Sequence, residues 1–178
     1  MSLALIKQGY RLLNDDLAYI GGPRGNEVRG VLEKVNFTGW TAEQFPECAK
    51  YFSDNGLDVS REKQPLDIRK IYGDKSVLDR GTAALIIMLK KDHESPLMAR
   101  RLDTFALLYH MYDAQILPVG PPCWQAVLDV ISHVRAFELF TGPDPVETAE
   151  WIHCNWEQLI LNSSTVLQEA QTGNNEIH

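Results

Sequence analysis

A histidine and two glutamates near the C-terminal end of the chain have the spacing of metal ligands on a helix. Glu150 and His153 are three residues apart, and Glu157 follows four residues later. On one continuous helix these side chains would share a face, which is how helices supply ligands to carboxylate-bridged di-iron sites. Such a site needs a second E-x-x-H step on another helix, and the sequence holds no second copy. A metal-dependent helical enzyme is therefore only the third hypothesis, and we expect no cofactor.

Basic side chains concentrate in the middle of the chain, where they are suited to contact phosphates or an acidic partner. Residues 61–101 hold 10 Lys and Arg against 6 Asp and Glu, whereas residues 102–178 hold 1 against 10. The candidate contact residues are Arg69, Lys70, Lys90, Lys91, Arg100 and Arg101. Carboxylates such as Asp67 and Asp92 are interleaved with them, which is typical of a solvated surface. Nucleic-acid binding, as in a viral or phage accessory protein, is the second hypothesis.

Two tryptophans in the acidic third are candidate interface anchors. Trp151 and Trp156 are five residues apart, which is about 140° around a helix, so both cannot lie equally deep on one face. An exposed tryptophan beside acidic residues is typical of a protein–protein contact, whereas a buried one simply closes the core. The leading hypothesis is a non-catalytic protein–protein interaction or assembly module. In it the basic 61–101 segment and the acidic third face complementary surfaces of a protein partner or of neighbouring copies.

Apolar residues recur at helical spacing over most of the chain, so we predict an all-α fold, a globular bundle of about seven helices. The expected helices cover 3–20, 26–38, 41–54, 76–91, 95–117, 124–141 and 144–161, with a weaker one at 165–171. The clearest start signal is Asp144-Pro145 with Glu147, an N-cap, a proline at the first helical position and a capping-box glutamate. An apolar stripe marks the helix over 95–117: Leu102, Phe105, Leu108, Tyr109, Tyr112 and Ile116.

The pattern predicts a single helical domain over residues 1–172 and a frayed tail over 173–178. An alternative division has two helical sub-lobes, 1–56 and 76–172, joined by a connection over 57–75. Within that connection Pro65 and Gly73 interrupt any sustained apolar face, and a short extended piece is expected around 68–72.

Composition limits the class of protein further. The longest uninterrupted apolar run, Ala83–Leu89, is far shorter than the roughly 20 residues that cross a bilayer, so we expect no membrane interaction. Cys48, Cys123 and Cys154 are odd in number and far apart, which favours a reducing compartment and a cytoplasmic location. The net charge of −7 disfavours binding of phosphates over the whole surface.

Overall fold

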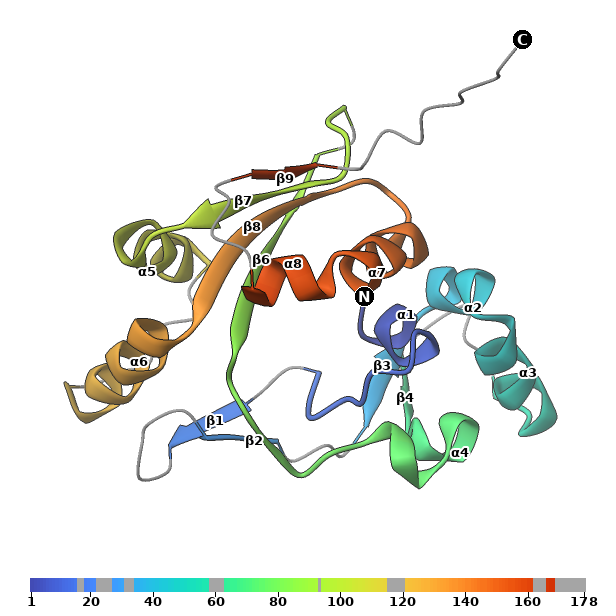
Figure 1. The fold of residues 1–178 in the computed structure, drawn as a ribbon. Helices are drawn as coiled ribbons and strands as arrows, with labels where there is room; N and C mark the ends of the chain where they lie inside the picture. Colours follow the sequence, from blue (N-terminus) through green and yellow to red (C-terminus); the bar gives the residue numbers. More distant parts are fainter. Residues whose placement is uncertain are drawn as a thin grey trace, which may run out of the picture.

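A computed structural model describes residues 1–15, 18–21, 27–30, 34–57, 63–92, 94–114, 121–161 and 166–168. A four-stranded sheet with the order β6-β8-β7-β9 forms its centre (Figure 1). Its strands are β6 (Leu85–Lys91), β7 (Met98–Leu102), β8 (Arg135–Thr141) and β9 (Val166–Gln168). β6 runs parallel to β8, and β7 is antiparallel to both β8 and β9. β8 has a strand on each side, and five of its seven residues are buried, more than in β6 or β7.

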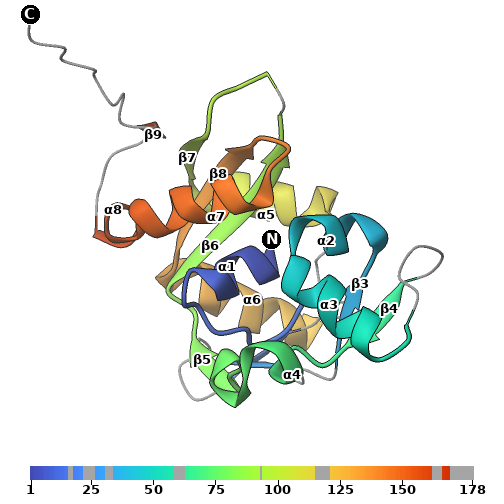
Figure 2. The same cartoon turned by 90° about the vertical axis from the view of Figure 1, so that its right-hand side faces the viewer.

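Helices cover both faces of this sheet. α5 (Thr104–Asp113) and α6 (Pro121–His133) lie on one face, which we call the α5 face (Figure 1). α1 (Ser2–Lys7), α7 (Pro145–Cys154) and α8 (Trp156–Leu161) lie on the other, the α7 face (Figure 2). Side chains alternate along each strand. Ala136 therefore packs with α5 and α6, whereas Phe137 and Leu139 pack with α7.

A second core lies beside α1, among shorter elements. These are β1 (Ala18–Gly21), β2 (Glu27–Gly30), β3 (Val35–Phe37), α2 (Gly39–Gln44), α3 (Pro46–Asp54), β4 (Gln64–Leu66), α4 (Arg69–Tyr72), a 3-10 turn (Asp74–Ser76) and β5 (Arg80–Thr82). β1, β2 and β5 form one antiparallel sheet, and β3 pairs with β4. Phe37, Phe52 and Ile68 are almost fully buried together with Ala4 of α1 and Ala149 of α7. The two cores therefore meet at the α1–α7 contact.

The predicted all-α bundle is wrong, because the chain forms three sheets as well as helices. The segments expected as helices over 76–91 and 124–141 contain β5, β6 and β8, and the helix expected over 95–117 begins as β7. A short continuous apolar run fits either a buried helix or a strand buried on both faces. Ala83–Leu89 is such a run, and pairing with β8 decides in favour of the strand.

The N-terminal third departs from the prediction in the same way. The helix expected over 3–20 ends at Lys7, and the helix expected over 26–38 is replaced by β2 and β3. The described part of the 57–75 segment, from Lys63 onward, contains β4, whose Leu66 lies in the same core as α1. The extended piece expected around 68–72 is wrong, because α4 occupies Arg69–Tyr72. β9 lies within the weaker helix expected at 165–171, whose remaining residues, like the expected tail over 173–178, are outside the described ranges.

Helix start signals were more informative than helix lengths. α7 begins after Asp144, whose side chain accepts the Val146 N–H at 2.7 Å, and Pro145 occupies the first position. Ser95, at which the helix expected over 95–117 would begin, instead donates its hydroxyl to Asp92 at 2.7 Å in the turn between β6 and β7. No helix in the described ranges combines the length and the apolar character that a bilayer crossing requires.

Candidate functional site

Three aromatic side chains form an exposed row along the outer surface of α5. Phe105, Tyr109 and Tyr112 are 84%, 68% and 72% exposed. Their spacing of i, i+4 and i+7 places them on one side of the helix. The opposite side carries Leu107 and Met111, which pack against the sheet. All three aromatics belong to the apolar stripe expected for this helix, but their rings face outward, whereas Leu102 and Leu108 of the same stripe pack in the core. We call these three residues the aromatic row.

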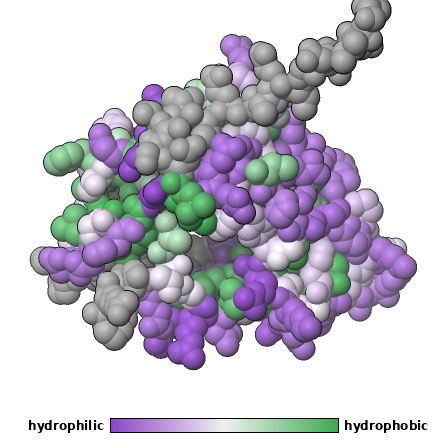
Figure 3. Space-filling model, in the orientation of Figure 1, coloured by the Kyte–Doolittle hydropathy of each residue, from purple (hydrophilic) through white to green (hydrophobic). Residues whose placement is uncertain are grey.

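The aromatic row is large enough to matter for association. An aromatic side chain buries roughly 150–250 Å² when it is covered, so three mostly exposed rings offer on the order of 400 Å². The largest apolar patch of a typical monomer is of similar size and is often functional. Trp124 and Leu128 of α6 are also partly exposed, at 37% and 40%. Figure 3 shows apolar side chains gathered on the side where Figure 1 places α5 and α6.

A buried carboxylate and three basic side chains lie beside the row. Glu138, in the middle of β8, is 1% exposed. Its carboxylate accepts a hydrogen bond from Arg100 at 2.5 Å and lies 3.5 Å from His110 Nε2 and 3.8 Å from Lys90 Nζ. The strand register explains the closest contact, since Arg100 is directly opposite Glu138. A buried carboxylate without such partners would cost the folded state several kcal/mol. The folded state therefore favours conformations in which the three basic side chains stay close to Glu138. We call these four residues the basic cluster.

The two long cations of the basic cluster remain half open to solvent. The side chains of Lys90 and Arg100 are 55% and 50% exposed. Both lie over the ring of Phe140, at 5.2 Å and 5.9 Å from its centroid. His110 connects the cluster to the aromatic row, because its ring lies 6.2 Å from that of Tyr109. The α5 face therefore presents aromatic rings and cations side by side, and of these residue types tyrosine and arginine are enriched at interface hot spots.

The other predicted contact cations lie elsewhere. Lys91 is opposite Thr141 and Arg101 opposite Phe137, so both alternate onto the α7 face. Arg69, on α4, makes two 2.8 Å bonds to Asp67, and these hydrogen bonds lower the pKa of that carboxyl. Lys70 is exposed on the same short helix. Of the six candidates, the fold places only Lys90 and Arg100 together in the basic cluster.

The predicted metal ligands do not share one helix. α7 ends at Cys154 and α8 begins at Trp156, so Glu157 belongs to a different helix from Glu150 and His153. His153 packs its ring edge-on against Tyr10 at 5.8 Å. Within the described ranges, no group of three or more His, Cys, Asp or Glu residues is arranged to hold a metal ion.

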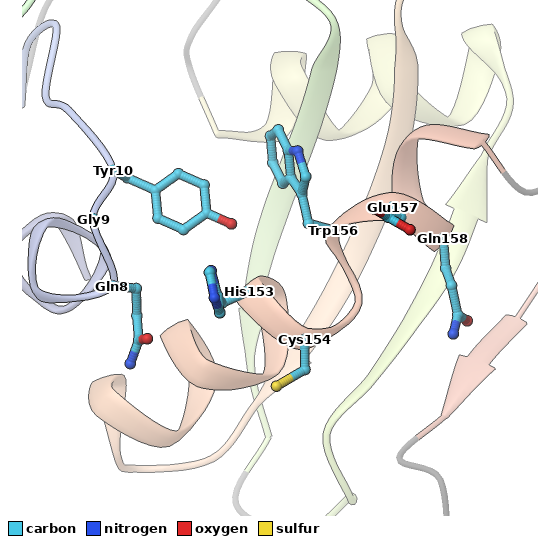
Figure 4. A pocket seen from close by; sticks show the side chains of 8 residues that line it. All are labelled: Gln8, Gly9, Tyr10, His153, Cys154, Trp156, Glu157 and Gln158. Carbon is cyan, nitrogen blue, oxygen red and sulfur yellow. The ribbon is translucent and has the colours of Figure 1, made fainter.

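The two candidate anchor tryptophans have different surroundings. Trp151 is 4% exposed in the core of the α7 face, so it is not available as a surface anchor, and its indole N–H has no hydrogen-bond partner among the described residues. Trp156 is 37% exposed and lies 5.5 Å from Tyr10. Figure 4 shows Tyr10 between His153 and Trp156, in a pocket of about 560 Å³ that Cys154 and Glu157 also line. Burial, reinforced by Cys154, raises the pKa of Tyr10.

Acidic side chains gather on the opposite side of the sheet from the aromatic row. Glu147 and Glu150 of α7 and Glu157 of α8 are all exposed. We call Glu147 and Glu150 the acidic surface of α7. The cations of the basic cluster and these carboxylates are thus separated by the central sheet and the helices on it.

Comparisons with known proteins add no family to this picture. No protein-family model matches the chain. Searches of curated proteins and of solved structures gave no significant match.

Proposed function

We propose that this protein is a non-catalytic assembly module that binds further copies of itself head to tail. The aromatic row and the basic cluster of one copy contact the acidic surface of α7 on the next copy. The observation that carries the proposal is the exposure of Phe105, Tyr109 and Tyr112 beside two half-exposed cations. Two different surfaces on opposite faces of one sheet favour a head-to-tail contact over a two-fold one.

The expected strength of this contact follows from its area. Covering about 400 Å² of apolar surface yields on the order of 10 kcal/mol at about 25 cal/mol per Å². Association itself costs an estimated 4–15 kcal/mol. Because these two free energies are of similar size, we expect a weak, reversible contact. The fraction of associated protein then depends on protein concentration. Charge pairs at its edge weaken as salt rises, because the screening length falls to about 3 Å at 1 M.

Light scattering across protein concentration and salt tests the proposal directly. At low salt the average mass should rise with concentration beyond that of one chain. Raising the salt should shift the mass toward the monomer, because Lys90 and Arg100 then attract Glu147 and Glu150 less. A mass that equals one chain at every concentration and salt contradicts the proposal.

A mixing experiment tests the head-to-tail geometry. Tyr109→Ser weakens the aromatic row, and Glu147→Lys with Glu150→Lys reverses the acidic surface. Each variant alone should remain a monomer, whereas their mixture should form a one-to-one pair, because each keeps the surface that the other lacks. Tyr19→Ser is the matched control, since Tyr19 is 56% exposed on β1, and it should assemble like the parent. Two variants that do not pair when mixed contradict a head-to-tail contact.

Single-stranded nucleic acid is the alternative ligand of the same surface. Proteins that bind single strands combine cations, which contact the phosphates, with aromatic side chains on which bases stack. Against it, Glu138 offsets one charge of the cluster, and Asp103 and Asp113 lie exposed at the two ends of α5. Filter binding at low salt separates the two: retention of a single-stranded probe that Tyr109→Ser abolishes would replace the assembly proposal.

A cytoplasmic location is part of the proposal. Cys48 and Cys154 are free thiols, as is typical of proteins in a reducing compartment.

A further inference from the structure

An apolar cavity of about 310 Å³ lies on the α7 face, away from the aromatic row. α1, the turn after it, β6, α7 and α8 all contribute to its wall. Its apolar lining includes Leu5, Ile6, Ile87, Leu89, Ile152 and Trp156. We propose that this cavity binds a small apolar ligand that carries one carboxylate, with the chemistry of a medium-chain fatty acid. This inference does not depend on the proposed assembly.

The side chains that line the cavity pack against buried residues on their other side. Leu5, Ile87 and Ile152 pack into the same buried cluster as Phe137 and Trp151. The ring of Trp156 is held by an edge-to-face contact with Tyr10, which borders both this cavity and the pocket in Figure 4. Pre-formed, mostly apolar walls with few polar groups are typical of small-molecule sites.

The volume sets the size of the ligand. An engineered apolar cavity of about 150 Å³ is known to bind benzene. The cavity here is about twice as large, so it suits a ligand of roughly twelve non-hydrogen atoms. A saturated carboxylate of about ten carbons has this size. Leu89, 49% exposed, leaves an apolar approach from solvent.

The charges at the mouth favour a negatively charged head group. Arg11 is the one charged side chain among the described residues that line the cavity, and it is exposed. Burial, opposed by Asp15 and reinforced by Lys91, lowers the pKa of the neighbouring Met1 amino group. Asp15 accepts the Ser2 hydroxyl at 2.7 Å. Arg11 therefore offers a guanidinium at the cavity with which a carboxylate could pair.

Calorimetric titration with decanoate, octanoate and decanol tests the proposal on the full chain. Octanoate should bind roughly fifteen-fold more weakly than decanoate, because each buried methylene contributes about 0.8 kcal/mol. Decanol should bind about three- to five-fold more weakly, as expected for the loss of one partly exposed ion pair. Arg11→Gln should remove the preference for decanoate over decanol and leave decanol binding unchanged. No binding of decanoate, or equal binding of decanoate and octanoate, would overturn the proposal.

A cavity-filling variant tests the location. Ile87→Phe should weaken decanoate binding at least ten-fold, with Leu128→Phe on α6 as a matched surface control that binds normally. Unchanged affinity in a folded Ile87→Phe variant would overturn the site. If that variant does not fold, the loss of head-group preference in Arg11→Gln decides the question. Tyr109→Ser should bind decanoate like the parent, so a failure of assembly leaves this test intact.

Discussion

α5 and α7 are two helices of ten residues on opposite faces of one sheet, and they use their apolar residues in opposite ways. Each begins behind an aspartate that accepts a backbone N–H, Asp103 from Ala106 at 2.8 Å and Asp144 from Val146 at 2.7 Å. α7 buries its tryptophan, whereas α5 leaves three aromatic rings in solvent. Similar local signals therefore give similar helices, and their surroundings determine which side chains are covered.

The difference follows from what packs around each helix. α7 lies between the sheet and α1, so Ala149 and Ile152 fall in two different buried clusters. Its outer surface is left to polar residues such as Glu150. α5 packs its inner side, with Leu107 and Met111, on the sheet and α6. Folding does not explain three large rings on its outer side, since polar residues there would cost the folded state little. They belong to the surface through which we propose that another copy binds.

Removing one aromatic side chain from each helix should give the largest difference in the free energy of unfolding. Trp151→Ala should lower the free energy of unfolding by about 3–5 kcal/mol, because it empties a buried site. Tyr109→Ala should change it by less than about 0.5 kcal/mol, because the side chain is mostly exposed. Urea unfolding of the two variants under non-associating, high-salt conditions measures both. A loss above about 2 kcal/mol for Tyr109→Ala would mean that the aromatic row is packed within the chain.

Arg100→Ala should destabilise the α5 face by about 1–3 kcal/mol, because it removes the closest partner of the buried Glu138 carboxylate. The half-exposed position of Arg100 keeps the loss below that of a fully buried pair. Adding Glu138→Gln should recover part of the stability. Lys90→Ala serves as the control, with a change below about 1 kcal/mol, since its 3.8 Å contact is longer and its side chain is exposed. Chemical denaturation that ranks Lys90→Ala above Arg100→Ala would contradict this account.

The two helix caps should contribute equally. Asp103→Ala and Asp144→Ala each remove one side-chain acceptor for a backbone N–H, and each should cost about 1 kcal/mol. Thermal unfolding followed by circular dichroism compares them. If only Asp144→Ala lowers the melting temperature, α5 is held by its packing and not by its cap.

The turn between β6 and β7 should make the stability of the protein depend on pH, independently of α5 and α7. Hydrogen bonds from the Ser95 hydroxyl, and from the Glu94 and Ser95 N–H groups, lower the pKa of Asp92. A carboxyl whose pKa is lowered on folding stabilises the protein above its unfolded pKa near 4, and this contribution disappears as the pH falls below that value. Asp92→Asn should therefore lower the urea midpoint slightly at pH 7, and this effect should shrink as the pH falls from about 4 through the lowered pKa of the folded state. An equal effect at both ends of this range would mean that the charge plays no part.

Local signals in the sequence predicted helix starts but not the sheet. Asp144-Pro145 marks the beginning of α7 because the cap and the proline act within one turn. Leu85–Leu89 and Arg135–Thr141 became strands because they pair with each other, and neither segment contains information about a partner so far along the chain. Lys90 and Lys91, the last residues of the helix expected over 76–91, instead extend β6.

The candidate site was predicted in part. The basic segment includes Lys90 and Arg100, but alternation along two strands determines that these two share a face while Lys91 and Arg101 do not. Glu138 is not predicted as a site residue, because its burial and its contacts come from Arg100, His110 and Lys90, which are distant in the sequence. The aromatic row was visible as a stripe of rings, and its spacing alone does not indicate whether it faces the core or the solvent.

The central position of β8 bears on how the chain folds while it is being synthesised. Among the strands that the structure describes, β6 pairs only with β8, and Arg135–Thr141 leaves the ribosome well after Leu85–Lys91. Until then the apolar strand is a nascent segment without a hydrogen-bonding neighbour, the kind of segment that chaperones bind. A message that ends before β8 should therefore yield an aggregation-prone fragment, not a smaller version of the native sheet.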